Sequence, residues 1–341
     1  MQRYWQLVCQ GLLLWLVALV CSGCGNTVQE HGKEDLIVYS SHPQRFVQPL
    51  VDEFERQTGI TVRVVHGSTG ELLDRVAKEQ PARADVFWGG AISKVEDQRA
   101  LFTAYVSSQD DKMRPQFRNT DGIMTRFTDV PSVLLVNTNL LGDREITGYK
   151  DLLAPWLKGR IAFADPAVSS SAYAHLLNMV DVMGKGNTVA GWDYVQAFGA
   201  NLAGQLLPDS QAVCAGVAQG KYAVGCTFEE AAILEAAKGS PVKIIYMEEG
   251  VHSVPDGVCI VRDTVHQEAA QAFVEFLVSR EAQAYIVREL HRRSVRQDVL
   301  PPDDRTLLPP LLEAASWEKA HDTVSQADLL AKFYRFCGRE D

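Results

Sequence analysis

The sequence predicts an α/β protein of two lobes, each a doubly wound sheet with helices on both faces, with a ligand cleft at the hinge between them. Three observations lead to this fold class. Residues 36–100 alternate strand and helix patterns at short spacing, which is typical of a doubly wound parallel sheet. A second α/β series starts at residue 131. About three hundred residues follow the N-terminal segment, more than one small core needs.

The N-terminus has the pattern of an export signal. An apolar run over residues 7–20 follows a basic residue and leads through small residues to Cys24. The run is short for a membrane span and fits a signal peptide over residues 1–23. Residues 20–24 (VCSGC) resemble the lipobox of bacterial lipoproteins, although Cys21 stands where an aliphatic residue is usual. The resemblance implies lipidation of Cys24, and an ordinary signal peptide or an uncleaved anchor are the alternatives.

Residues 24–35 are polar and lack an apolar pattern, so we expect a flexible linker between the membrane and the fold. The chain beyond it divides into two lobes. We assign residues 36–131 and 257–297 to lobe one, and residues 132–256 and 298–341 to lobe two.

Lobe one is expected to open with a strand–helix–strand–helix–strand series. Its first helix carries Phe46, Val47, Leu50, Val51 and Phe54 on one face and stops at Gly59. The expected strands cover residues 36–40, 60–65 and 85–88, and the later helices cover residues 71–79 and 92–100.

Lobe two opens with residues 131–136 (PSVLLV), an apolar run without alternation that is typical of a strand buried on both faces. Further strands are expected over residues 158–163, 222–225, 242–246 and 257–261. The expected helices cover residues 172–183, 192–200, 211–219 and 227–238, one long amphipathic helix covers residues 267–289, and short helices end the tail.

Composition excludes several functions. A net charge of −10 argues against nucleic acid as a partner, because phosphate backbones need basic faces, but it leaves a single anionic ligand open. No P-loop, Gly-x-Ser-x-Gly elbow or His-Glu-x-x-His helix occurs, and the histidines have no metal-ligand spacing. We therefore expect no enzyme, cofactor or metal site.

Four cysteines remain beyond the signal and the lipidation site: Cys214, Cys226, Cys259 and Cys337. An exported protein permits disulfides, but no spacing indicates a metal motif. Buried free thiols and one bridge are both open, with Cys214 and Cys226 as the first pair to test.

Four loops at the ends of expected strands are rich in hydroxyls or precede helices. They are Ser40-Ser41-His42, Ser68-Thr69-Gly70, Ser169-Ser170-Ser171 and Thr227-Phe228-Glu229. Ligands of open α/β sheets bind at such strand ends, and helix N-termini with serine or threonine hydroxyls stabilise anions. Helix capping explains each loop taken singly. The expected convergence of three of them on one cleft points towards an anion-binding site, and helix capping stays the alternative.

Other residues are weaker candidates for ligand contact. Asp209 and Glu229 suit the hydroxyls of a sugar or a cationic group, although both also fit the first turn of a helix. Trp88 beside two glycines suits stacking on a ring, although packing is the usual role of a lone tryptophan. The basic residues of the 291–296 segment (HRRSVR) favour salt bridges over ligand contact.

An ordered set of motifs resembles one known family. The motifs are residues 36–40 (LIVYS), 54–60 (FERQTGI), 84–90 (ADVFWGG), 158–166 (KGRIAFADP), 223–230 (AVGCTFEE) and 292–296 (RRSVR). They are similar to the ferric-iron, thiamine and phosphorylated-solute group of extracellular solute-binding proteins of ABC importers. The resemblance implies a type II periplasmic-binding-protein fold in a monomer outside the cytoplasmic membrane, with a permease and its cytoplasmic ATPase as partners.

The resemblance also bears on the ligand. Iron-binding members use a neighbouring tyrosine pair near the position where this chain reads residues 225–229 (GCTFE), and that pair is absent. The hydroxyl loops look like the branch that binds hexose phosphates or phosphonates, in which such loops take the phosphate and acidic residues take the organic part. Ferric-iron or thiamine binding on the same scaffold is the alternative, and an exported phosphatase is less favoured.

Overall fold

The computed structural model describes residues 36–79, 83–91, 95, 98–120, 122–251, 253–299 and 326–338. The predicted signal peptide, Cys24 and the linker lie outside these residues, as does most of the helix predicted over residues 92–100. None of the described helices combines the length and the apolar character that a membrane span needs.

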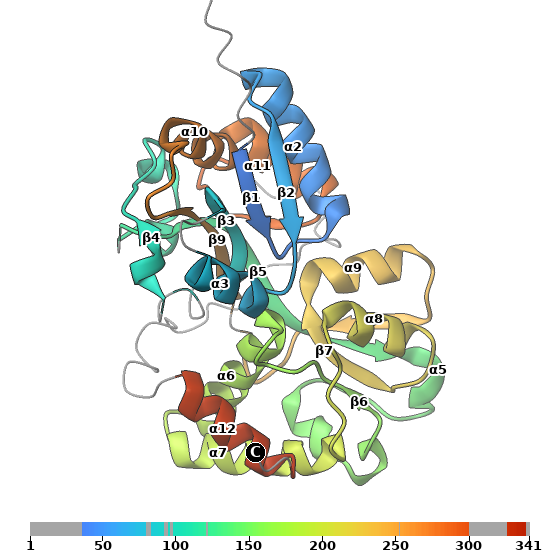
Figure 1. Cartoon of the computed structure of the whole chain (residues 1–341). Helices are drawn as coiled ribbons and strands as arrows, with labels where there is room; N and C mark the ends of the chain where they lie inside the picture. The colour runs from blue at the N-terminus through green and yellow to red at the C-terminus, as the bar shows by residue number, and fades with distance from the viewer. Residues whose placement is uncertain are drawn as a thin grey trace, which may run out of the picture. The chain divides into compact units, whose positions relative to one another are not determined.

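The helices and strands follow the predicted order, and most predicted elements are present within a few residues (Figure 1). The first part of the chain forms β1 (Leu36–Ser40), α2 (Gln44–Thr58), β2 (Val62–His66), α3 (Thr69–Lys78), β3 (Val86–Ala91), β4 (Phe102–Thr103) and β5 (Thr125–Asn137). The middle part forms α5 (Thr138–Leu141), β6 (Ile161–Ala162), α6 (Ser170–Gly184), α7 (Thr188–Leu202), α8 (Ser210–Ala218), β7 (Val224–Phe228), α9 (Glu229–Ala237) and β8 (Val242–Ile245). The last part forms β9 (Ser253–Val261), α10 (Gln267–Leu277), α11 (Arg280–Glu289), β10 (Arg293–Ser294) and α12 (Gln326–Phe336).

Short 3-10 turns connect several of these elements. They cover Arg99–Leu101, Asp110–Lys112, Pro115–Phe117, Tyr149–Leu153 and Pro155–Leu157.

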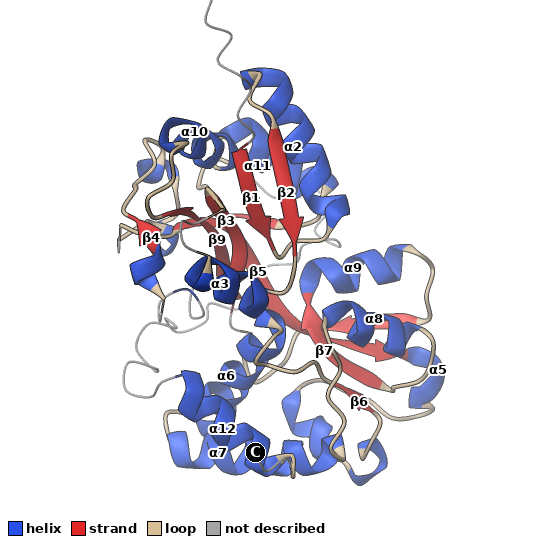
Figure 2. Cartoon of the chain, viewed as in Figure 1, coloured by secondary structure: helices blue, strands red, loops and turns tan. Residues whose placement is uncertain are grey.

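Strand β5 belongs to both lobes. The strand order is β2-β1-β3-β9-β5-β7-β6, and β5 changes partner between Pro131, which pairs with Ser253 of β9, and Ser132, which pairs with Phe228 of β7. Figure 2 shows β5 running from the strands around β3 and β9 to the strands around β7. The predicted parallel sheets are in fact mixed, because β5 and β9 pair antiparallel while β1 pairs parallel with β2 and β3. The residue limits predicted for the lobes stay a prediction.

Each lobe has its own hydrophobic core. In lobe one, Phe54 of α2 and Phe273 of α10 pack on one face of the sheet, while Leu72 of α3 packs on the other face with Phe87 of β3. In lobe two, β5 and β7 share one core with α6, α7 and the C-terminal helix α12. Helices thus cover both faces of the lobe-one sheet, as the sequence predicts, and the two-lobe α/β fold class is confirmed.

Local signals set most helix ends. Helix α2 buries Phe46, Val47, Leu50, Val51 and Phe54 on one side and ends at Gly59, whose φ of 72° suits glycine. The long helix predicted over residues 267–289 is instead two helices. Ser279 breaks it, because the serine side chain accepts a hydrogen bond from the backbone N–H of Ala282 and caps α11.

The four cysteines predicted to remain after processing are free thiols, and all are buried. Cys214 and Cys226 therefore do not form the bridge that export would permit. Burial raises the pKa of the Cys214 thiol to about 11, which keeps it protonated and unreactive.

Helices α6 and α7 pack closely at Gly191, and we predict that Gly191→Ala destabilises the protein. A Cβ at this position would overlap the backbone carbonyl of Val180 in α6. Overpacking of this kind costs about 1–3 kcal/mol, more than the gain of up to about 1 kcal/mol from alanine in a helix. Urea denaturation measures the free energy of unfolding, and an unchanged or higher value would show that the two helices are less tightly packed.

Candidate functional site

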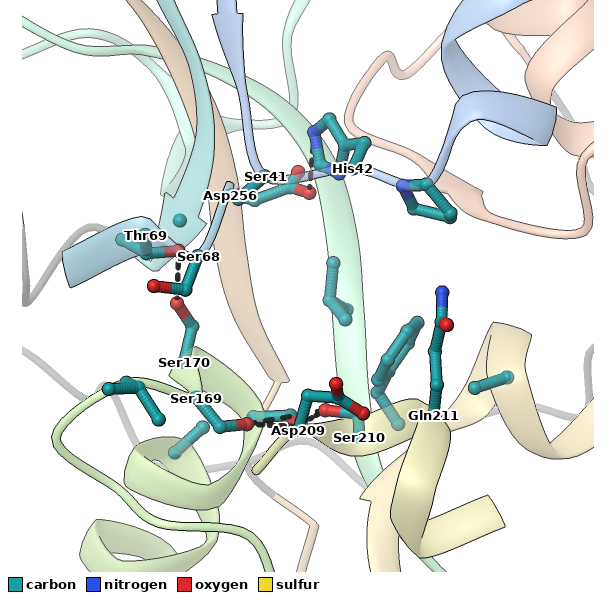
Figure 3. A pocket seen from close by; sticks show the side chains of 18 of the residues that line it. Ser41, His42, Ser68, Thr69, Ser169, Ser170, Asp209, Ser210, Gln211 and Asp256 are labelled. Carbon is teal, nitrogen blue, oxygen red and sulfur yellow. Dashed lines mark hydrogen bonds and ion pairs between the residues drawn. The ribbon is translucent and has the colours of Figure 1, made fainter. Parts of the chain in front are cut away.

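A pocket of about 620 Å³ lies where the loops of the two lobes meet (Figure 3). Its lining combines hydroxyl groups with a few charged side chains. The lining includes Ser41, His42, Pro43, Arg45, Ser68, Thr69, Ser169, Ser170, Ser171, Asp209, Ser210, Gln211, Phe228, Asp256 and Arg292.

Five helices of the described chain begin at this pocket. Their N-cap residues, which all line it, are Pro43 of α2, Ser68 of α3, Ser169 of α6, Asp209 of α8 and Phe228 of α9. Each helix N-terminus carries unpaired N–H groups and about half a positive charge. Pro43 and Phe228 make no side-chain capping hydrogen bond, so their helices leave the most backbone donors unused. The backbone dipoles of these five helices thus add positive potential to the pocket, whatever the net charge of the chain.

Hydroxyl groups from three helix starts form a cluster in the pocket. Ser171 Oγ lies 2.6 Å from Ser210 Oγ, and Ser169 Oγ lies 3.2 Å from both. On the lobe-one side, Thr69 Oγ1 lies 2.8 Å from Ser170 Oγ (Figure 3). We call these five residues the hydroxyl cluster. The hydroxyls satisfy one another, and each can rotate to donate to an incoming anion instead.

Two glycines at the end of β3 make room for this arrangement. Gly89 has φ of 128°, and a Cβ there would overlap Ser41 Oγ. Gly90 has φ of 80°, and a Cβ there would lie 2.6 Å from Thr69 Cγ2. Only glycine combines this backbone conformation with so close an approach, so the pair allows Ser41 and Thr69 to reach the same pocket.

Buried ion pairs line the hinge side of the pocket. Arg292 donates through Nε to Glu230 and through Nη1 to Asp256, both at 2.6 Å. Arg45, a half-exposed residue in the first turn of α2, reaches the other oxygen of Glu230 at 3.2 Å. Burial disfavours the charge of Arg292, but the two carboxylates hold its pKa above the ordinary value. Strand β9 carries Asp256 and helix α9 carries Glu230, so Arg292 links the hinge strand to lobe two.

His42 is neutral in this environment. Burial, followed by the positive charge of Arg292, holds the pKa of His42 well below its ordinary value. Arg292 Nη1 lies 3.3 Å from His42 Nδ1 and can only donate, so Nδ1 accepts and Nε2 carries the proton. Nε2 lies 3.5 Å from Asp256 Oδ2.

A second buried network positions helix α6 against β7. His175 Nε2 donates to the Thr227 carbonyl at 2.7 Å, because a carbonyl only accepts. His175 Nδ1 therefore accepts from the Tyr149 hydroxyl at 2.7 Å, and Asn178 Nδ2 donates to the same hydroxyl at 2.9 Å. This chain of bonds holds the helix that carries Ser170 and Ser171 in a fixed position relative to Phe228.

The structure brings eight of the thirteen predicted ligand residues to the pocket. They are Ser41, His42, Ser68, Thr69, Ser169, Ser170, Ser171 and Asp209. Ser40, Gly70, Trp88, Thr227 and Glu229 do not line it. Their roles as ligand contacts stay predictions that the geometry does not favour.

Two of the predicted residues that do not line the pocket contact other residues instead. Trp88 is fully buried and packs edge-on against Phe127 and Phe273, with ring centroids 5.5 Å away in both cases. Glu229 is 1% exposed and binds both Nε and Nη2 of Arg293. The sequence shows a carboxylate at a helix start but not the arginine that neutralises it.

Sequence reasoning missed several pocket residues. Ser210 and Gln211 directly follow Asp209, and the preference for capping residues at α8 was a signal that could have found them. Asp256 carried no such signal, because it meets Arg292 only through strand pairing and the packing of α11. Arg292 belongs to the basic 291–296 segment, for which the sequence favoured salt bridges over ligand contact. The salt bridges predicted for the 291–296 segment are confirmed for Arg292, Arg293 and Arg296.

Comparison with known proteins agrees with this architecture. The model of the bacterial extracellular solute-binding protein family matches residues 36–289. The chain belongs to this family. Its fold and its role as a solute-binding protein rather than an enzyme are therefore confirmed, as the motifs predicted.

One curated relative and two solved structures illustrate what this chain is similar to. Iron uptake protein A1 of Synechocystis sp. is 27% identical over 75% of this chain and 74% of its own length. A structure titled as a two-component system protein mediating signal transduction is 32% identical, with a TM-score of 0.73 over 80% of this chain and 90% of that one. The periplasmic binding protein AfuA of Actinobacillus pleuropneumoniae, with fructose 6-phosphate bound, is 21% identical, with a TM-score of 0.73 over 89% of this chain and 96% of that one.

The His175 network predicts a pH effect on stability. Burial lowers the pKa of His175 to about 4, so the unfolded chain binds this proton more readily than the folded protein between about pH 6.5 and 4. Stability is therefore lost as the pH falls through this window. We expect His175→Gln, which cannot titrate, to reduce the loss of unfolding free energy between pH 7 and 4.5 by about 2 kcal/mol. Urea denaturation at both pH values measures it, and equal losses in both proteins would contradict the prediction.

Proposed function

We propose that this chain is the lipid-anchored receptor of an ABC importer that captures a phosphorylated small organic solute, of the sugar phosphate or phosphonate type. The solute closes the two lobes, and the closed protein delivers it to the membrane permease. Cys24 provides the lipid anchor and residues 24–35 the spacer, both proposed from sequence.

The convergence of five helix N-termini and the hydroxyl cluster on one pocket carries this proposal. A phosphate needs several donors around its oxygens, and backbone N–H groups with serine hydroxyls supply them without a dedicated lysine. AfuA, whose structure holds fructose 6-phosphate, resembles this chain in fold. At 21% identity that likeness shows the fold alone, so the donors of this chain are the stronger support.

Closure follows from where the donors lie. Thr69 begins α3 in lobe one, and Ser170 begins α6 in lobe two. A phosphate held between the two helix starts contacts both lobes in the closed state but only one lobe in an open state. Such differential contact is what shifts a two-state protein towards closure, and a permease that binds the closed state then selects the loaded receptor.

Ferric iron is a second candidate ligand, favoured by the 27% identity to an iron uptake protein. Fe(III) prefers phenolate and carboxylate oxygens. None of the described residues that line the pocket is a tyrosine, and the described residues hold no group of three or more His, Cys, Asp or Glu side chains that would suit a metal ion. Growth of a charge-transfer band in the visible spectrum on adding ferric citrate would favour iron.

Signalling is a second candidate use of the same binding event. The observation is the 32% identical structure, titled as a two-component system protein. In this case the closed lobes dock on a membrane sensor instead of a permease. Uptake of labelled sugar phosphate by cells that lack this chain distinguishes the two roles. Uptake is lost if the chain serves a permease. If the chain serves only a sensor, a permease that is already expressed still takes up the sugar phosphate.

We expect the purified protein to bind fructose 6-phosphate and Ser169→Ala to weaken that binding about tenfold or more, because a hydrogen bond to a charged group contributes about 1.5–3 kcal/mol. Ser279→Ala is the matched control. Both serines cap a helix, and their Oγ atoms accept from Ala172 N and Ala282 N respectively, but Ser279 does not line the pocket.

Isothermal titration calorimetry gives the affinities, and thermal unfolding corrects for the cap lost in each variant, about 1 kcal/mol. The proposal is rejected if phosphate esters and inorganic phosphate fail to bind or to stabilise the wild-type protein. It is also rejected if the two serine variants bind equally well.

The anchor has a test of its own. We expect metabolic labelling with a fatty acid to mark the protein, and Cys24→Ala to abolish the label, because Cys24 is the proposed acylation site. Cys214→Ala is the control, since this buried thiol is not exposed to modification. Label that persists in Cys24→Ala would place the anchor elsewhere.

A further inference from the structure

Arg292 is buried in salt bridges and also lines the pocket, which the salt bridges alone do not explain. The residue is only 5% exposed, yet it lines the pocket. Its guanidinium carbon lies 4.2 Å from the ring centroid of Phe46 and 5.6 Å from that of Phe228. Two aromatic rings, one from each lobe, thus hold the guanidinium plane in position.

The donors of Arg292 are only partly used. Nε donates to Glu230, and Nη1 donates to Asp256 and approaches His42 and Thr128. Nη2 has no hydrogen-bond partner among the residues that the structure describes. A guanidinium has five N–H donors in a fixed fork, and leaving donors of a buried charge without a partner is costly. The two N–H groups of Nη2 are therefore available to a molecule in the pocket.

We propose that Arg292 is a ligand-binding residue whose Nη2 donates to a neutral oxygen, a hydroxyl or a carbonyl, of the bound solute. This inference rests on the proposed function, because it concerns the part of the solute that is not its phosphate. Arg292 would then select, among phosphorylated solutes, those whose organic part carries a hydroxyl or a carbonyl.

Charge decides which group of a ligand can accept a hydrogen bond from Arg292. Glu230 and Asp256 carry two negative charges, and Arg292 and Arg45 carry two positive charges, so this side of the pocket is close to balanced. Because the charges of Arg292 and Arg45 are already paired with these carboxylates, a second anion would give up its hydration for little net attraction here. An ammonium group would meet a donor that cannot accept from it. A neutral acceptor oxygen pairs with Nη2 without either penalty.

The phosphate and the acceptor oxygen need different parts of the pocket. Figure 3 shows His42 and Asp256, the partners of Arg292, on the opposite side of the open pocket from Ser169, Asp209 and Ser210. A solute that reaches both sides has a phosphate at the hydroxyl cluster and a hydroxylated or carbonyl-bearing body. Inorganic phosphate is too small to reach both, so it binds without using Arg292.

The test measures the affinities of the purified full-length protein for fructose 6-phosphate, 2-aminoethylphosphonate and inorganic phosphate. We expect fructose 6-phosphate to bind most tightly. Arg292→Lys keeps the charge but loses the fork, and it should weaken fructose 6-phosphate about tenfold while leaving inorganic phosphate within about twofold. Arg293→Lys is the matched control, because the neighbouring Arg293 forms an equally short pair with Glu229 but does not line the pocket.

A ligand pair on the wild-type protein keeps the test independent of folding of the variant. We expect 6-hydroxyhexyl phosphate to bind more tightly than hexyl phosphate, because only the first offers an acceptor at its far end. Equal affinities for this pair would overturn the inference. So would equal effects of Arg292→Lys on fructose 6-phosphate and inorganic phosphate, or equal effects of the two lysine variants. Failure of the wild-type protein to bind any phosphate would instead reject the proposed function.

Discussion

The pairing of β5 with strands of both lobes is the constraint on which the site depends. Its first half pairs with β9 and its second half with β7 and β8, so one hydrogen-bonded strand joins the two cores. Residues 133–136 are buried on both faces, and a slip of one residue would break the packing on each side. The strand therefore determines how the helix N-termini of lobe one are positioned opposite the helix N-termini of lobe two.

An acidic chain can hold an anion because the relevant charges are local. The net charge is −10, yet five helix N-termini point their dipoles into one pocket, and these fields act over a few ångströms. Of the acidic residues that line the pocket, Asp256 pairs with Arg292 and Asp209 caps helix α8. Arg292 and Arg45 pair with Glu230, and Arg293 pairs with Glu229. The electrostatic potential inside the pocket therefore depends on these nearby groups and not on the net charge of the whole protein.

Two buried polar networks give the pocket its shape. Hydrogen bonds run from Asn178 Nδ2 through the Tyr149 hydroxyl and His175 to the Thr227 carbonyl, and they connect helix α6 to β7. The network around Arg292 is different, since one nitrogen is left to the pocket. The first network connects a helix to a strand, whereas the second has a donor that is free among the described residues, Nη2 of Arg292, which we propose for a ligand.

Short-range patterns in the sequence were enough to predict most helices and strands, the positions of the hydroxyl loops and the family to which the chain belongs. Phe46 and Leu50 mark the buried face of α2, and Ser68 and Ser169 mark helix starts, because periodicity and capping act within a few residues. The sequence did not indicate the break at Ser279, where one cap outweighs a continuous apolar pattern. Only the tertiary structure decided that Trp88 is core, that Arg293 neutralises Glu229, and that Arg292 meets Asp256 beside the pocket. Such pairings join residues from distant segments, and strand pairing and helix packing, not local preference, bring them together.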